Sequence, residues 1–476
     1  MQPFDLPAAL ADALKVRRQR LAEKVSFPVI LWSGQSSSRN FPANTFPFRA
    51  SSHFLYFAGF PLENAVIRLE AGTLQLFMDE ADPASALWHG ELPKRDEIAT
   101  VMGADAAFPL SELKAIGGSP DAAEFPVKPS PWAIGAATIP GQDGRTIAEQ
   151  GLTFQRSLFG GKQVTGMDLE LAQAIVSLRL THDAAALAEL RKAAAVSVTA
   201  HKAGMAATRI AHVEAQVRAA IEHVMMANNM PCAYASIVTV HGEVLHNQQY
   251  HHPLESGDLL LVDAGAETTS GWASDITRTW AVSGKFSPTQ RAIYAIVLAA
   301  HDACIAAIRP GVEYRDIHLL AAKMIATGLV DLGILRGQPE DLVEMDAHAL
   351  FFPHGVGHLL GLDVHDMEDL GDVAGYAAGR VRSDRFGLNY LRLNRPLQPG
   401  MLVTIEPGFY QVPAILNDPE RRTRYRDVVN WDRLAQFRDV RGIRIEDDVL
   451  VTETAAEVLT AALPTEIEAI EQIVRG

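Results

Sequence analysis

Acidic side chains stand at the ends of several apolar stretches that are typical of buried strands. Asp263 ends the run LLLVD, and Glu406 follows the run LVTI. Glu446 follows the alternating GIRI, and Asp275 stands in the apolar WASDITRTW. A buried carboxylate loses its hydration and repels other buried carboxylates, so it needs a compensating partner. The chain must therefore fold so that these acids meet cations or hydrogen-bond donors.

A histidine-rich segment supplies further polar groups in an apolar setting. The stretch FFPHGVGHLLGLDVHD, residues 351–366, contains His354, His358 and His365 among large apolar side chains. One buried imidazole is an ordinary core residue, but three in one segment indicate a site. His354 and His358 are one helical turn apart, yet the glycines between them make a regular helix costly. A helix and a loop both remain open for this pair.

The four carboxylates and the histidines together form a hard, oxygen-rich set of donors. Taken singly, each acid fits a salt bridge or a helix cap, but their recurrence beside the histidine segment favours a metal centre. Such a set suits a pair of divalent ions such as Mn, Co, Fe or Zn in a hydrolytic site. The only cysteines are Cys232 and Cys304, so a zinc site of thiolates is excluded by count.

Charge and hydropathy exclude other classes of function. The formal net charge of −15 argues against nucleic acid as the main partner, because phosphate binding needs a basic face. The most apolar long window, residues 291–308, is interrupted by Arg291, His301 and Asp302, which indicates a buried helix and not a membrane span. The first residues lack a basic start followed by an apolar run, so we expect a cytoplasmic protein.

The pattern of elements predicts a mixed α/β (α+β) chain of two domains. We expect a smaller α/β domain over residues 1–178 and a larger domain over residues 179–476, with the boundary near residues 176–184. The predicted strands are 28–33, 65–69, 74–78, 236–240, 259–265 and 401–407, with a hairpin over 442–452. The predicted long helices are 186–229, 288–308 and 313–332, with Thr181 or Asp183 as the first helix cap. Residues 131–160 are rich in Gly, Pro and small residues.

At these residues the chain resembles a known family. LLLVDAG, SDITRT, PHGVGHLLGLDVHD, TIEPGFY and GIRIEDD follow one another as in the metallopeptidases with the pita-bread fold, in the group of aminopeptidase P and prolidase. The likeness covers residues 183–460. FRASSHFLYFAGF (48–60) and LWHGELP (87–93) are similar to the N-terminal domain of that group. The stretch between the two aspartates is slightly long for aminopeptidase P, and we expect the TTSGW turn to absorb the difference.

The resemblance implies a metal centre with five protein ligands. They would be Asp263, Asp275, His358, Glu406 and Glu446, of which Asp275 and Glu446 would bridge the two ions. Manganese is the first expectation for both ions, with Co²⁺, Zn²⁺ or Fe²⁺ as alternatives.

The resemblance also implies roles for residues around the metals. Glu406 would accept a proton, and His354 would line the site near the substrate proline. His365 would hydrogen-bond the scissile peptide or the oxyanion, and His246 would support it from across the cleft. Arg444 and Tyr410 would brace the ligand carboxylates. His251 and His252 are expected to be loop residues.

The implied activity is hydrolysis of an Xaa-Pro bond in small proline-containing peptides by an Xaa-Pro aminopeptidase. The alternative is a prolidase, restricted to dipeptides. The long segment 411–441 resembles the prolidase insertion, and Arg421, Arg422, Arg424 and Arg426 could bind a dipeptide's carboxylate there, or form a solvated surface helix. A metal-free hydrolase of the creatine type, a non-catalytic binding protein and a methionyl aminopeptidase are more distant alternatives. By resemblance we expect a homodimer or a homotetramer.

Overall fold

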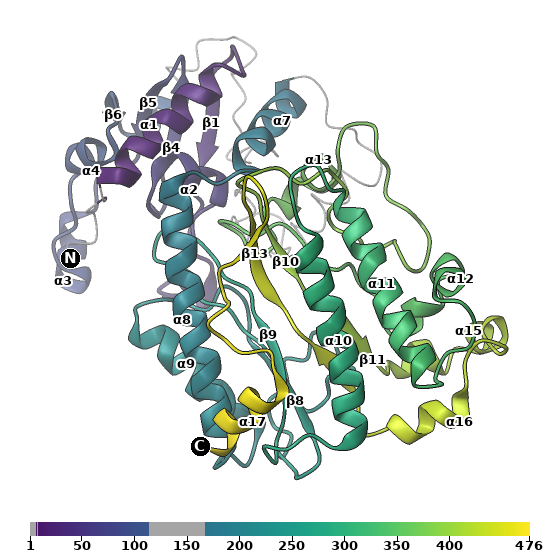
Figure 1. Cartoon of the computed structure of the whole chain (residues 1–476). Helices are drawn as coiled ribbons and strands as arrows, with labels where there is room; N and C mark the ends of the chain where they lie inside the picture. The colour runs from purple at the N-terminus through teal and green to yellow at the C-terminus, as the bar shows by residue number, and fades with distance from the viewer. Residues whose placement is uncertain (1–5, 7, 114–166) are drawn as a thin grey trace. The chain divides into compact units, whose positions relative to one another are not determined.

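The computed structural model describes residue 6 and residues 8–113 and 167–476, and these residues form two compact units (Figure 1). The first unit comprises Met1–Ala186 together with Met367–Ala374. The second comprises Leu187–Asp366 and Gly375–Gly476. The predicted Gly- and Pro-rich stretch 131–160 lies outside the described residues.

The first unit contains a four-stranded sheet in the order β1-β4-β5-β6. Its neighbouring strands are antiparallel except for β5 and β6, which are parallel. The strands are β1 (Val29–Trp32), β4 (Val66–Glu70), β5 (Thr73–Phe77) and β6 (Ala106–Phe108), and the longer helices are α1 (Ala8–Ala22), α2 (Ser52–Ala58), α4 (Arg95–Met102) and α7 (Met167–Arg179). The three strands predicted in this part of the chain are confirmed, whereas α7 was not predicted.

Short strands in the second unit form two three-stranded sheets and one two-stranded sheet. Their orders are β7-β8-β9, β10-β13-β14 and β11-β12. The strands are β7 (Ile237–Thr239), β8 (Leu259–Asp263), β9 (Thr277–Ala281), β10 (Leu402–Ile405), β11 (Gly408–Tyr410), β12 (Gly442–Arg444), β13 (Asp447–Val451) and β14 (Ala456–Val458). An isolated bridge between Thr277 and Glu446 links β9 to the segment between β12 and β13. The strand predictions 236–240, 259–265 and 401–407 are confirmed.

The predicted hairpin over 442–452 is wrong. Its two halves, β12 and β13, are strands that do not pair with each other: β12 pairs with β11, and β13 pairs with β10 and β14. A tight hairpin turn needs residues with positive φ, and no residue between 442 and 452 has one. The chain therefore runs on and changes partners at Ile445 and Glu446.

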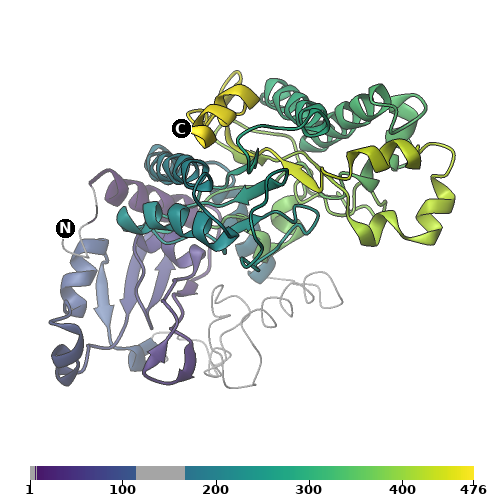
Figure 2. The same ribbon diagram turned by 90° about the horizontal axis from the view of Figure 1, so that it is seen from below.

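Two pairs of helices pack beside these strands, as the two views in Figures 1 and 2 show. They are α8 (Ala184–Thr208) with α9 (Glu214–Ala227), and α10 (Pro288–Ala307) with α11 (Tyr314–Asp331). Each pair approaches closely at a glycine: a Cβ on Gly204 would lie 2.7 Å from Ile221 Cγ1, and one on Gly328 would lie 2.4 Å from Ile296 Cγ1. In the part of the chain that the structure describes, no helix combines the length and hydropathy needed to cross a bilayer.

The helices predicted at 288–308 and 313–332 are confirmed. The prediction of a single helix over 186–229 is wrong, because this stretch forms two helices, α8 and α9. The chain turns between Thr208 and Glu214, so two helices replace one. Glu214 enters the second helix fully buried, where its carboxylate accepts hydrogen bonds from the backbone N–H groups of Val240 and His252. At the start of α8, Asp183 accepts a hydrogen bond from the backbone N–H of Ala186, as expected of a cap.

Candidate metal centre and active site

The five predicted metal ligands line one cavity of about 410 Å³ in the second unit. This volume lies within the usual range for sites that bind small ligands. The cavity is lined by Leu245, His246, Asp263, Asp275, Pro353, His354, Gly355, His358, His365, Tyr390, Arg392, Glu406, Val412, Ile415, Arg444 and Glu446. The lining therefore includes all the predicted metal ligands, all the predicted catalytic histidines and Arg444, but not Tyr410.

Different elements present the five side chains to the cavity. Asp263 ends β8, and Asp275 stands two residues before β9, where Thr277 pairs with Asp263. Glu406 follows β10, and Glu446 lies at the crossover between β12 and β13. His358 belongs to a loop whose backbone pairs with Thr404 of β10 through two hydrogen bonds. The open choice between helix and loop for His354 and His358 is thus resolved as a loop.

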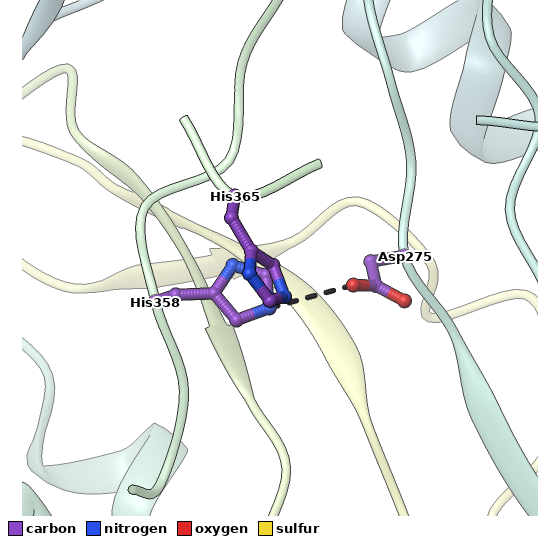
Figure 3. A group of neighbouring side chains, drawn as sticks. All are labelled: Asp275, His358 and His365. Carbon is purple, nitrogen blue, oxygen red and sulfur yellow. Dashed lines mark ion pairs between the residues drawn. The ribbon is translucent and has the colours of Figure 1, made fainter. Parts of the chain in front are cut away.

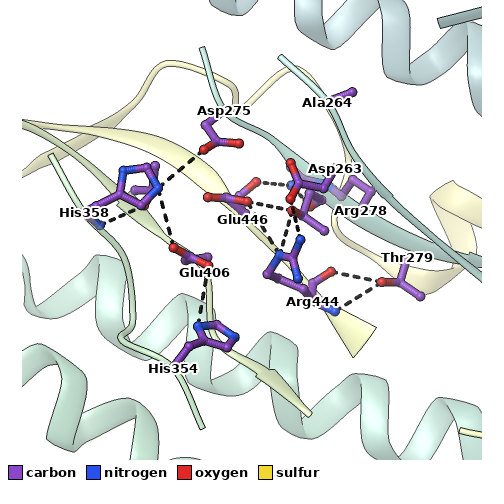
Figure 4. Close-up of polar contacts among 12 residues, drawn as sticks. Asp263, Ala264, Asp275, Arg278, Thr279, His354, His358, Glu406, Arg444 and Glu446 are labelled. Atoms are coloured by element: carbon purple, nitrogen blue, oxygen red, sulfur yellow. Dashed lines mark hydrogen bonds and ion pairs between the residues drawn. The ribbon is translucent and has the colours of Figure 1, made fainter. Parts of the chain in front are cut away.

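The donor atoms fall into two overlapping groups with Glu446 in both (Figure 4). Oxygens of Asp263, Asp275 and Glu446 all lie within 4.8 Å of one another. Donor atoms of His358, Glu406 and Glu446 meet the same criterion. Two adjacent cations could occupy these groups and share the Glu446 carboxylate between them.

The protonation of His358 leaves one nitrogen able to bind a cation. Its Nδ1 lies 3.0 Å from the carbonyl oxygen of Leu359, so Nδ1 carries a proton and Nε2 is the ring nitrogen that can bind an ion. That Nε2 lies 3.4 Å from Asp275 Oδ2 and 3.6 Å from Glu406 Oε1 (Figures 3 and 4). A divalent ion can take the place of a proton between an imidazole nitrogen and carboxylate oxygens, so these donors fit a divalent ion.

Burial and mutual repulsion disfavour the charged forms of three of these acids. Burial, and then the nearby charge of Asp263, raises the pKa of Asp275 to about 7. Burial raises the pKa of Glu406 to about 7, and burial with the charge of Asp275 raises the pKa of Glu446 well above its usual value. Divalent ions would compensate these charges, which the protein's own cations do only in part.

Arg444 and hydroxyl groups hold the carboxylates from behind. Arg444 donates to Asp263 Oδ2 at 2.5 Å and to the Tyr410 hydroxyl at 3.0 Å. Its Nε donates to the Thr277 hydroxyl at 2.9 Å, and that hydroxyl donates to Glu446 Oε2 at 2.6 Å. The Tyr234 hydroxyl lies 2.6 Å from Asp263 Oδ1 and 2.5 Å from Asp275 Oδ1.

Sequence reasoning missed Tyr234 and Thr277 as members of the site. Thr277 follows Asp275 by two positions and therefore shares its side of an extended chain, which is a signal that was present. Tyr234 precedes its strand with no such pattern, so only the fold brings it to the aspartates.

His354 is held as a neutral imidazole in the cavity wall. Its Nδ1 lies 2.8 Å from the carbonyl oxygen of Gly355, which assigns the proton to Nδ1. Its Nε2 therefore accepts from the Tyr410 hydroxyl at 2.9 Å, while that hydroxyl accepts from Arg444. Burial, with the charge of Arg444, lowers the pKa of His354 to about 3.

The remaining two predicted histidines also reach the cavity. The ring of His365 lies 4.1 Å, centroid to centroid, from that of His358, and Figure 3 shows both rings near Asp275. One nitrogen of His365 is close enough to Asp275 and His358 for the three to share a cation. His246 lines the cavity from the loop after β7, and burial with the charge of Arg444 lowers its pKa.

The four arginines proposed for a dipeptide's carboxylate are not among the residues that line the cavity. Arg421 lies 3.7 Å from Asp418, and Arg422 donates to the carbonyl of Leu416. Arg424 donates to the carbonyl of Met345, and Arg426 donates to the carboxylate of Asp427. The same insertion instead gives the cavity Val412 and Ile415, and Arg392 is in the lining in addition to Arg444. Sequence reasoning missed Arg392, because nothing in YLRLNRP distinguishes one arginine from the next.

The TTSGW stretch forms the turn that we expected between the two aspartates. The backbone N–H of Thr268 donates to the carbonyl of Trp272, and that of Gly271 donates to the carbonyl of Thr268. Gly271 has a φ of 93°, a conformation that favours glycine. Residues 268–272 therefore form a turn between the two aspartates.

Two buried histidines outside the cavity lining, His318 and His348, make stability depend on pH. Burial lowers the pKa of His318 to about 4 and that of His348 to about 3. Unfolding restores an ordinary pKa of about 6.5, so below that pH the unfolded chain binds protons that the folded protein does not. The free energy of unfolding should fall with decreasing pH by up to about 1.4 kcal/mol per pH unit for each histidine, and this loss should end near the folded pKa.

We expect His348→Met to remove one histidine's share of this slope. The measurement is urea unfolding of the wild type and of His348→Met, both in chelator, between about pH 7 and pH 5. The difference between the two slopes of unfolding free energy against pH gives the contribution of His348, because the carboxylates that both proteins contain contribute equally to each slope. Equal slopes in the two proteins would contradict the prediction.

Comparison with known proteins places these observations in context. Residues 188–453 match the sequence profile of metallopeptidase family M24, and residues 14–119 match that of the aminopeptidase P N-terminal domain. The chain is 32% identical over 439 residues to the probable Xaa-Pro aminopeptidase PEPP of Uncinocarpus reesii, covering 90% of this chain and 86% of that protein. It is 33% identical over 429 residues to a probable Xaa-Pro aminopeptidase of Verticillium alfalfae, covering 89% and 87%.

Solved structures agree with the sequence relatives. Aminopeptidase P from E. coli with the inhibitor Pro-Leu aligns over 99% of both chains with a TM-score of 0.75 and 28% identity. Pseudomonas aeruginosa aminopeptidase PepP aligns over 99% of both chains with a TM-score of 0.73 and 29% identity.

Proposed function

Because the chain belongs to metallopeptidase family M24, we propose that it is an Xaa-Pro aminopeptidase. It is a metallo-exopeptidase that hydrolyses the bond between the N-terminal residue of a peptide and a following proline. Its larger domain has the pita-bread fold of that family, and an aminopeptidase P-type domain precedes it. The presence of that preceding domain favours this activity over a prolidase.

One observation carries the catalytic part of the proposal. His358 directs Nε2 at the carboxylates of Asp275 and Glu406, at 3.4 Å and 3.6 Å, in a cavity that also holds Asp263 and Glu446. We propose these five residues as the ligands of two divalent ions, with Asp275 and Glu446 shared and Mn²⁺ as the native metal. Ions bound there would activate a water molecule and polarise the scissile carbonyl. A metal-free scaffold has no comparable reason to gather these donors.

The surrounding residues position and protonate the substrate. Glu406 is the proton acceptor, because its carboxylate lines the cavity beside His358 and can take a proton from water and return it to the leaving proline nitrogen. His246 and His365 offer ring nitrogens to the scissile peptide and the oxyanion. His354 forms part of the wall for the proline ring. Arg444 holds the Asp263 carboxylate in place through an ion pair.

Arg392 is the specific observation that favours the second candidate, a prolidase. Its guanidinium lies in the lining together with Tyr390, Val412 and Ile415, and it could bind the terminal carboxylate of an Xaa-Pro dipeptide. In a longer peptide the proline is followed by an amide in place of a carboxylate, so its binding is stabilised less by the Arg392 guanidinium. Both activities would use the same metal centre.

Substrate length and composition test the proposed function directly. With Mn²⁺ present, we expect release of the first residue from Xaa-Pro-Xaa, and a fall in kcat/KM of at least about 10²-fold when alanine replaces proline, because the proline wall loses its partner. Chromatography of the products measures both rates. Turnover of Xaa-Pro dipeptides without any cleavage of Xaa-Pro-Xaa would contradict the aminopeptidase and favour the prolidase.

Arg392→Ala separates the two candidates further, with Arg426→Ala as the control. For an aminopeptidase, Arg392→Ala should change kcat/KM for tripeptides by less than about threefold, whereas a prolidase should lose about 10-fold or more through KM for the dipeptide. Arg426 side-chain atoms are 70% exposed, and its removal should change neither value.

Further features remain predictions within this proposal. The N-terminal domain over residues 1–178 would shield the cleft or mediate association, and residues 179–476 would carry catalysis. A homodimer or homotetramer and a cytoplasmic location are expected. Small proline-containing peptides are the proposed substrates.

A further inference from the structure

Three acids stand in a row in GIRIEDD, and the proposed function uses only the first. Glu446 faces the candidate metal centre, while Asp447 and Asp448 begin β13 and are fully buried. Successive residues of a strand point to opposite sides, so the two aspartates must find different partners. Two further buried carboxylates beside an already crowded acidic site require an explanation.

Asp447 is neutralised by cations on its side of the strand. Arg278 donates to Asp447 Oδ1 at 2.8 Å, and His301 Nε2 lies 3.0 Å from Oδ2. The same guanidinium donates to the carbonyl oxygen of Glu446 at 2.6 Å and to that of Thr277 at 3.0 Å. Asp447 thus takes part in a structural network behind Glu446, in which its charge is balanced.

Asp448 instead contacts the segment that presents Asp275. Its Oδ1 accepts from the backbone N–H of Asp275 at 3.0 Å, and its Oδ2 accepts from the Ser274 hydroxyl at 2.8 Å. No cation is paired with Asp448 among the described ion pairs of the chain. Both oxygens of the Asp448 carboxylate therefore accept hydrogen bonds from this one loop.

The same two segments are joined again two residues away. The backbone N–H of Glu446 donates to the carbonyl of Thr277 at 3.0 Å, and the Thr277 hydroxyl donates to Glu446 Oε2 at 2.6 Å. Residues 274–277 and 446–448 are thereby tied at both ends, and the side chains of Asp275 and Glu446, which Figure 4 shows near each other, line the cavity. A rotation of either segment would have to break one of these contacts.

We propose that Asp448 is a positioning residue that clamps the Asp275 loop and so sets the spacing of Asp275 and Glu446, the two carboxylates that the ions would share. This inference rests on the proposed function, because that function requires a dinuclear centre. Bridging carboxylates must be held to a fraction of an ångström, and hydrogen bonds from outside the ligand set commonly supply that order. Asp448 does so through the loop backbone and touches neither substrate nor ion.

Titration of the metal-stripped full chain with Mn²⁺ by calorimetry tests the clamp. We expect Asp448→Ala to weaken Mn²⁺ binding by about 10- to 100-fold and to lower kcat at fixed Mn²⁺, while KM for an Xaa-Pro-Xaa tripeptide stays within about twofold. Asp448→Asn should restore binding to within about threefold, since its amide can accept from the Asp275 N–H and donate to the Ser274 hydroxyl. Ser274→Ala removes one of the two contacts and should give a smaller loss in the same direction.

Glu457→Ala is the matched control. Glu457 lies opposite Leu450 in the neighbouring strand β14, and its ion pair with Arg191 is exposed, so Mn²⁺ binding should not change. Binding by Asp448→Ala with wild-type affinity would overturn the clamp, as would an Asn variant as weak as the Ala variant. Failure of the wild type itself to bind Mn²⁺ would instead overturn the proposed function. If Asp448→Ala does not fold, Ser274→Ala decides alone, and unchanged Mn²⁺ binding in that variant would overturn the clamp.

Discussion

Removal of divalent ions should reduce hydrolysis of an Xaa-Pro-Xaa tripeptide by at least about 10³-fold, because the ions would supply several kcal/mol of transition-state stabilisation. The side chains that remain cannot replace them. Asp275, Glu406 and Glu446 all have raised pKa values in their buried setting, so at neutral pH they hold protons or repel one another. The measurement is the rate of release of the first residue after exhaustive chelation, and again after addition of Mn²⁺, which should restore it.

The control for chelation is the same chelator already saturated with a divalent ion, which should leave the rate unchanged. Metal analysis of the stripped protein must accompany the assay. Full activity in a protein shown to hold no divalent ion would contradict the metal centre, and a metal-free hydrolase of the creatine type would then explain the fold better. Restoration by Co²⁺ or Zn²⁺ in place of Mn²⁺ would change only the native metal that we propose.

The members of the site that were predictable are those with a local signature. A carboxylate that ends an apolar strand is conspicuous, as Asp263 is after LLLV and Glu406 is after LVTI, because burial of such a group is costly without a partner. Tyr234 and Arg392 have no such signature. They reach the cavity through the packing of segments distant in sequence, and an aromatic or basic residue in a loop has many ordinary explanations.

The errors in the fold have the same origin. The hairpin over 442–452 failed because alternation predicts that a segment is a strand and says nothing about which strand it joins. The break between α8 and α9 lacks a glycine or proline that would mark it. Helix α7 was missed although Leu171, Ala174, Ile175 and Leu178, all buried, have the spacing of one helical face.

Glu406→Gln should lower kcat by about 10²- to 10⁴-fold at saturating Mn²⁺, the usual contribution of a proton-transferring side chain. In the wild type, Glu406 Oε1 lies 3.6 Å from His358 Nε2. The amide of the variant has the same size and keeps one oxygen, but it cannot accept the proton. KM for the tripeptide should change far less than kcat, because the substitution leaves the proposed proline wall with His354 unchanged. Steady-state kinetics at several Mn²⁺ concentrations measure both values.

The interpretation depends on separating proton transfer from loss of a ligand. If Glu406→Gln acts only by weakening metal binding, rising Mn²⁺ should return kcat to that of the wild type, and the role as proton acceptor would be wrong. If kcat stays low with two ions bound per chain, the missing step is the proton transfer. Glu222→Gln is the matched control: Glu222 pairs with Arg218 at 2.7 Å outside the cavity lining, so its charge can be removed without touching the site. A comparable loss of kcat in that variant would mean that the effect of Glu406→Gln reflects general damage to the fold.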